Sequence, residues 1–131
     1  MAKKVTEILD TNVLVRFLVG DIPAQKTTAV KWFLEAEKDK RDIIVSTIVI
    51  AETIFVLESF YKQTKENVAA AMEIFLSQRW LIVQERDVLL ASLAFYRNEK
   101  HFVDSYLLAW SQHHHAGIMS FDKKLKKEVK K

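Results

Sequence analysis

Short apolar runs alternate along the chain with longer segments whose apolar residues recur at helical spacing. The short runs predict four strands, at 5–9 (VTEIL), 42–46 (DIIVS), 81–84 (LIVQ) and 117–121 (GIMSF). The longer segments predict helices beginning at about Thr11 and spanning 23–40, 47–62, 65–78, 87–99 and 102–115. Strands separated by helices imply parallel pairing through right-handed crossovers, so the pattern predicts an α/β fold. The 47–62 helix is almost wholly apolar and is expected to be central to the core.

Composition supports one helix-rich domain covering residues 1–131. Half of the residues are hydrophobic, and the chain has only two Gly and one Pro, which disfavours a fold built from many tight turns. The first residues do not resemble a secretory signal, because acids interrupt the first apolar run. The longest apolar stretch, 43–51, is far shorter than the ~20 residues that span a bilayer. We therefore expect a soluble, cytoplasmic protein without a membrane partner.

Positive charge is concentrated at the end of the sequence. The chain has a net charge of +3, and residues 123–131 (KKLKKEVKK) hold six Lys and one Glu. Such a patch suits a phosphate backbone, whose binding releases counterions. The alternative is a solvated tail that keeps the protein soluble, and the sequence alone favours this reading somewhat.

Two acids directly follow predicted strands. Asp10 comes after the 5–9 run, and Asp122 comes after the 117–121 run. In open parallel sheets, ligands bind beyond the carboxyl ends of the strands. On its own, however, each acid is more typical of a helix N-cap, because Asp is a preferred cap and a helix can follow both positions.

Glu52 lies within the most apolar helix. Its neighbours on the same helical face are Ile48, Val49, Phe55 and Val56, with no Lys or Arg at pairing distance. A carboxylate in that setting is protonated, meets a partner from elsewhere, or binds a cation. A buried structural ion pair is the alternative to a site.

Asp104 falls in the first turn of the 102–115 helix and borders the apolar stripe that contains Leu107 and Trp110. The helix dipole favours an acid in the first turn, so a surface acid explains Asp104 as well as a ligand does.

The four acids together indicate a hard-metal site. If they converge, their repulsion requires a neutralising cation. Oxygen ligands suit Mg²⁺ or Mn²⁺, and the absence of Cys excludes a zinc-thiolate site. The consecutive residues His113–His115 point about 100° apart on a helix and cannot chelate one ion together. A metal held by carboxylates can activate water for phosphodiester cleavage.

The acidic motifs resemble those of PIN-domain ribonucleases, and most of all the VapC-type toxins of prokaryotic toxin–antitoxin pairs. The resemblance is carried, in order, by ILDTNVLVRFL, TIVIAETIFVLE, FVDSYLLAW and SFDKKL. Each motif is weak alone, but four in order over almost the whole chain are fairly specific.

The resemblance implies a three-layer α/β/α domain with a short parallel sheet of about four or five strands. It also implies a Mg²⁺- or Mn²⁺-dependent endoribonuclease whose catalytic and metal-binding acids are Asp10, Glu52, Asp104 and Asp122. Asp10 and Asp104 match the acids most expected to touch metal. Glu52 would hold a second metal or orient water, and Asp122 would complete the set, either directly or through water.

The partners that the resemblance implies are an RNA substrate, a cognate antitoxin protein and a second copy in a homodimer. The alternative function is a non-catalytic RNA-binding or protein-interaction module on the same fold, which the basic end of the sequence favours.

Overall fold

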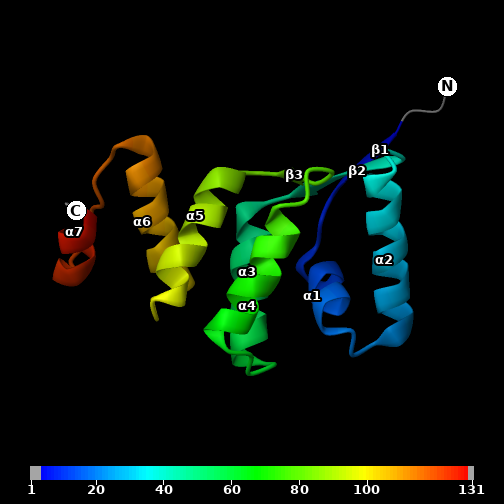
Figure 1. Cartoon of the computed structure of the whole chain (residues 1–131), viewed down its shortest axis with the longest axis horizontal. Helices are drawn as coiled ribbons and strands as arrows, with labels where there is room; N and C mark the ends of the chain where they lie inside the picture. Colours follow the sequence, from blue (N-terminus) through cyan, green and yellow to red (C-terminus); the bar gives the residue numbers. More distant parts are fainter. Residues whose placement is uncertain (1–3, 130–131) are drawn as a thin grey trace.

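The computed structural model describes residues 4–129 and contains helices and strands in the expected alternation (Figure 1). The elements, in chain order, are β1 (Val5–Ile8), α1 (Thr11–Val19), α2 (Pro23–Glu37), β2 (Arg41–Val45), α3 (Thr47–Ser59), α4 (Lys65–Leu76), β3 (Ile82–Val83), α5 (Arg86–Arg97), α6 (Phe102–His114) and α7 (Lys123–Val129). The predicted helices are confirmed, with ends that differ by a few residues.

The sheet has three parallel strands in the order β1-β2-β3. Val5 to Ile8 of β1 face Arg41 to Ile44 of β2, and β3 pairs with Ile44 and Val45 on the other side of β2. The parallel α/β fold is therefore confirmed, consistent with α/β/α layering. The described residues have three strands, fewer than the four or five expected.

The strand predicted at 117–121 is wrong, because this segment is irregular between α6 and α7. Its apolar residues suit a strand, but a strand also needs a neighbouring backbone with which to exchange hydrogen bonds. Figure 1 shows the segment at the end of the long axis away from β1, so no strand of the sheet lies beside it.

The core lies where α3, α4 and α5 meet beneath the sheet. Ile50, Ile54 and Leu57 of α3 are buried, together with Leu76 of α4 and Leu89 of α5. The expectation that α3 is central is confirmed for this face. The opposite face of α3 is exposed, which changes the setting of Glu52.

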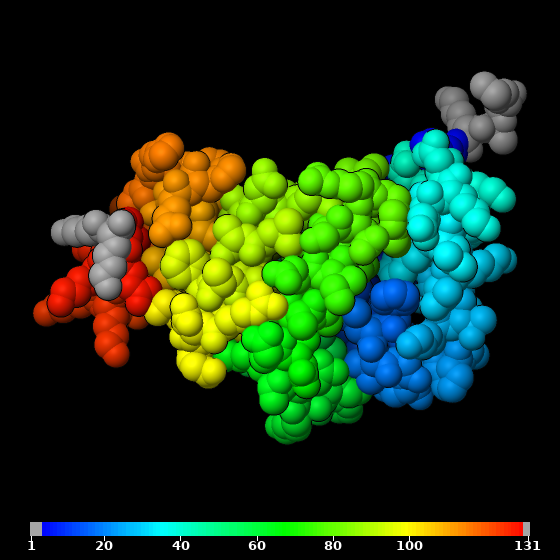
Figure 2. Space-filling model, in the orientation of Figure 1, coloured from blue at the N-terminus to red at the C-terminus, as the bar shows by residue number. Residues whose placement is uncertain are grey.

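The last three helices follow one another along the long axis of the molecule (Figure 1). α5 packs on α4, α6 packs on α5, and α7 packs on α6. Figure 2 shows the resulting shape, with α6 and α7 at one end of the surface and α2 at the other. α5 is firmly seated, because Leu89, Leu93 and Tyr96 are at most 1% exposed.

Most of the Lys-rich end of the chain is a helix, not the solvated tail that the sequence favoured. Residues Lys123–Val129 form α7, and Leu125 is buried against its surroundings. Lys100 bonds to Glu128 at 2.6 Å and ties α7 to the loop before α6. Lys130 and Lys131, which belong to the same basic run, lie outside the described residues.

Across residues 4–129, every helix is too short or too polar to cross a membrane.

The seating of α5 predicts the effect of a core truncation. Leu89→Ala removes a fully buried side chain, so we expect the free energy of unfolding to fall by about 2–5 kcal/mol. Leu34→Ala is the control, because Leu34 is 47% exposed on α2 and its truncation should change stability by less than about 0.5 kcal/mol. Urea unfolding of both variants measures this, and equal midpoints would contradict the packing of α5.

Candidate functional site

Asp10 links the end of β1 to the start of α1. It has an extended backbone and occupies the N-cap of α1, and its carbonyl oxygen accepts bonds from the N–H groups of Val13 and Leu14. Its carboxylate, however, makes no capping hydrogen bond. The position is that of a cap, but the side chain is free for another ligand.

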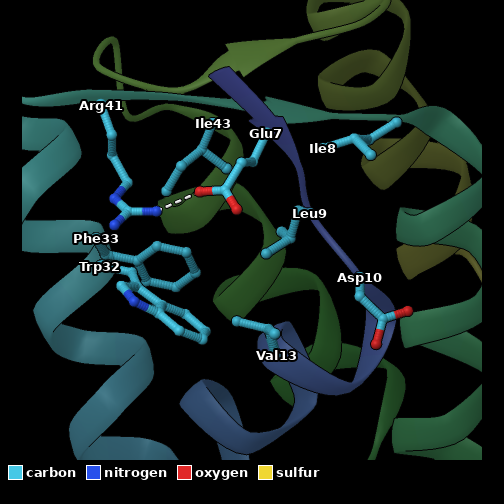
Figure 3. A pocket seen from close by; sticks show the side chains of 9 residues that line it. All are labelled: Glu7, Ile8, Leu9, Asp10, Val13, Trp32, Phe33, Arg41 and Ile43. Carbon is cyan, nitrogen blue, oxygen red and sulfur yellow. Dashed lines mark hydrogen bonds and ion pairs between the residues drawn. The ribbon is translucent and has the colours of Figure 1, made fainter. Parts of the chain in front are cut away.

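A mostly apolar pocket borders Asp10 between β1 and α2 (Figure 3). Its other charged groups neutralise each other: Arg41 pairs with Glu7 inside the pocket and lies 3.3 Å from Glu35. The Arg41 guanidinium is also 5.9 Å from the ring centre of Trp32. Figure 3 shows the Asp10 carboxylate turned away from this group. Arg41 is therefore engaged in structural ion pairs, and within residues 4–129 no basic side chain pairs with Asp10.

Glu52 does not lie in the buried apolar setting expected for it. Its side chain is exposed, and its neighbours on the same face, Ile48 and Phe55, are 76% and 67% exposed. The periodicity correctly placed these residues on one face, but no described segment covers that face. Among residues 4–129, no basic side chain pairs with Glu52.

Asp104 lies in the first turn of α6, as predicted, and is partly exposed. In the part of the chain that the structure describes, its carboxylate has neither a hydrogen-bond donor nor a basic partner. The dipole of α6 favours its negative charge. Like Asp10 and Glu52, Asp104 offers carboxylate oxygens that could bind a metal, and within residues 4–129 no basic side chain pairs with it.

The carboxylate of Asp122, unlike that of Asp10, caps a helix. Its Oδ1 accepts bonds from the backbone N–H groups of Lys124 and Leu125, at 3.0 and 3.2 Å, at the start of α7. Its own N–H donates to Ser120 Oγ at 2.9 Å. The carboxylate is exposed and forms the helix cap, with Oδ2 free of these bonds.

The chemistry of these acids fits a hard cation, whose preferred ligands are carboxylate oxygens. In residues 4–129, no three acidic or histidine side chains lie close enough to hold a metal ion together. α6, which carries Asp104, packs on α5 and meets the start of α3. The assignment of all four acids to one site therefore stays a prediction.

Glu85 is a contact residue that the sequence interpretation missed. It follows β3 with a left-handed backbone (φ 54°), which non-glycine residues rarely adopt. Its carboxylate accepts bonds from Thr47 Oγ1 at 2.6 Å and from the Tyr106 hydroxyl at 2.8 Å. It thereby joins the starts of α3 and α6. No local pattern signals this role, because both donors are distant in sequence.

Burial and the bond to Glu85 raise the pKa of Tyr106 to about 12. We predict that Glu85→Gln lowers this pKa toward the ordinary value of about 10, although burial will keep it above that value. Because both folded and unfolded chains keep the phenol protonated below about pH 10, the stabilisation is complete there and is lost as pH rises toward 12.

Ultraviolet titration of tyrosinate, with Tyr106→Phe subtracted to assign the signal, measures the shift. Identical Tyr106 titrations in the wild type and in Glu85→Gln would contradict the hydrogen bond.

Comparison with known families places this arrangement in context. The family model described as the PIN domain matches residues 8–130, nearly the whole chain. The matched range contains all four candidate acids and every helix. No curated protein and no solved structure matches the chain.

Proposed function

The chain belongs to the PIN-domain family, and on that premise we propose that it is a metal-dependent endoribonuclease that hydrolyses RNA phosphodiester bonds. PIN domains are generally nucleases, which supports the class of reaction. In this proposal the catalytic and metal-binding acids are Asp10, Glu52, Asp104 and Asp122, and the cation is Mg²⁺ or Mn²⁺.

The observation that carries the proposal is the free carboxylate of Asp10. It lies at the carboxyl end of β1, the edge of a parallel sheet where ligands bind. The nearby acid Glu7 is neutralised by Arg41, whereas Asp10 is not. A carboxylate left without a protein cation at this edge is suited to a metal ion.

The roles of the acids are those that the family resemblance implies, and their environments are compatible with them. Asp10 and Asp104 would be the direct ligands, and within residues 4–129 neither carboxylate has an ion pair or a capping hydrogen bond. Glu52 orients the attacking water or holds a second cation. Asp122 uses Oδ1 for its cap, so it acts through Oδ2 or a bridging water. The bound cation would lower the pKa of water and stabilise charge on the scissile phosphate.

We further propose that the protein is the toxin of a type II toxin–antitoxin pair. A cognate antitoxin would cover the site and place a basic side chain among acids that have no basic partner in the described chain. Co-expression with the product of the neighbouring gene, followed by purification through a tag on this chain, tests the pairing. Repeated recovery of this chain without a partner would contradict it.

The first prediction of this function concerns Asp10. Asp10→Asn keeps the shape of the side chain but removes its charge, so we expect metal-dependent RNA cleavage to fall at least about 100-fold, equivalent to several kcal/mol of transition-state stabilisation. The measurement is cleavage of a mixed structured RNA pool in Mg²⁺, Mn²⁺ or EDTA.

The matched control is Asp87→Asn, in the exposed first turn of α5, which should cleave like the wild type. Undiminished cleavage by Asp10→Asn would refute the assignment.

A non-catalytic RNA-binding module is the second candidate, and the exposed Lys residues of α7 favour it. It predicts salt-dependent RNA binding that survives replacement of all four acids, with no cleavage by the wild type in any metal. Cleavage by the wild type rejects it.

A further inference from the structure

In the described part of the chain, no strand lies beside the outer edge of β1. β1 pairs with β2 on one side only, because it lies at the end of the sheet order. All four of its residues are exposed, and Val5 and Ile8 are apolar residues with 53% and 64% of their surface accessible. An open edge with apolar side chains is a template for another strand.

The 117–121 segment, in turn, has no neighbouring strand among residues 4–129 with which to exchange backbone hydrogen bonds. It has the apolar composition of a strand but pairs with no strand within the described chain. Met119 and Phe121 have relative accessibilities of 103% and 106%, so their side chains contact almost nothing. Large apolar side chains this exposed mark an interaction site.

The segment cannot reach the β1 edge of its own copy in this structure. The two lie toward opposite ends of the long axis (Figure 1). Between them, α5 is seated in the core by Leu89 and Leu93, and Glu85 bonds to both Thr47 and Tyr106. With α5 and α6 held in this arrangement the segment does not meet its own β1, whereas a second copy can present the segment while these contacts are kept.

We propose that the 117–121 segment of a second copy adds to the free edge of β1 as a fourth, parallel strand, and that the two copies do this reciprocally. Main-chain hydrogen bonds then satisfy the edge of β1 and the backbone of the segment together. The exchange is symmetric, so it closes as a dimer rather than growing into a filament.

Other exposed apolar surfaces are consistent with this dimer. Ile48 and Phe55 form an uncovered stripe on α3, and Val103 on α6 is 61% exposed. α3, which carries Ile48 and Phe55, follows β2, the neighbour of β1, and α6, which carries Val103, leads into the 117–121 segment.

The dimer would also bring candidate acids of the two copies together, an extension that rests on the proposed function. Asp10 lies two residues beyond the end of β1, and Asp122 directly follows the 117–121 segment. Parallel pairing brings the two carboxyl ends to the same edge. Each site would then combine Asp10 and Glu52 of one copy with Asp104 and Asp122 of the second copy.

Cross-linking tests the strand exchange without requiring activity. The chain has no Cys, so Thr6→Cys on β1 and Met119→Cys on the segment introduce single reactive thiols. We expect a short bismaleimide to join a tagged Thr6→Cys chain to an untagged Met119→Cys chain. Lys31→Cys, exposed on α2, replaces Thr6→Cys in the control and should give no such product.

Two results would overturn the proposal. One is the absence of the mixed product together with a monomeric mass at all concentrations. The other is cross-linking within one chain when both Cys residues are on it and the protein is dilute, because the segment would then close on its own β1.

Replacing both exposed side chains is a second test. Met119→Asp with Phe121→Asp should abolish the dimer in light scattering but leave the melting temperature of the dilute monomer unchanged, since neither side chain is packed. A dimer that persists, or a monomer that is destabilised, would contradict the exchange.

Complementation connects the dimer to the active site. A mixture of Asp10→Asn and Asp104→Asn chains should recover about a quarter of the wild-type cleavage, because half of the dimers are mixed and one of their two sites is intact. Cross-linking without recovery, although the wild type cleaves, would reject the shared site. A wild type that cross-links but never cleaves would instead refute the proposed function and leave the dimer standing.

Discussion

The need of every strand for a backbone partner organises this structure. Among the strands of residues 4–129, β2 alone has a neighbour on both sides, and β1 and β3 are each attached to the sheet through β2. The sheet consequently ends at β1, the strand that leads into Asp10. The open edge and the candidate chemistry therefore lie at the same place in the fold, and whatever completes the edge also changes the surroundings of Asp10.

Charge neutralisation separates the candidate acids from many others. Glu7, Asp21 and Glu128 pair with Arg41, Arg16 and Lys100. The hydroxyl of Tyr61 and the charge of Arg16 also lower the pKa of Asp21, so that acid is held in its charged form by its neighbours. Asp10 and Glu52 have no such partners within residues 4–129.

The connection between α3 and α6 depends on Glu85, whose left-handed backbone aims its carboxylate at two hydroxyl groups. Backbone conformations of this kind persist only when surrounding contacts stabilise them. Here the contacts hold α6, and with it Asp104, beside the start of α3. The position of one catalytic candidate is thus set by a residue outside the acidic motifs.

By itself, the sequence determined the helices from α1 to α6, the three strands of the sheet and the order of the four acids, because apolar periodicity and strand composition are local properties. It also placed Ile48, Glu52 and Phe55 on one face of α3. Only the tertiary structure decided that this face is exposed, that Asp10 does not use its carboxylate as a cap while Asp122 does, and that 117–121 lacks a strand partner. Burial and strand pairing depend on surfaces supplied by distant residues, and no local pattern states which surface, or which copy of the chain, will supply them.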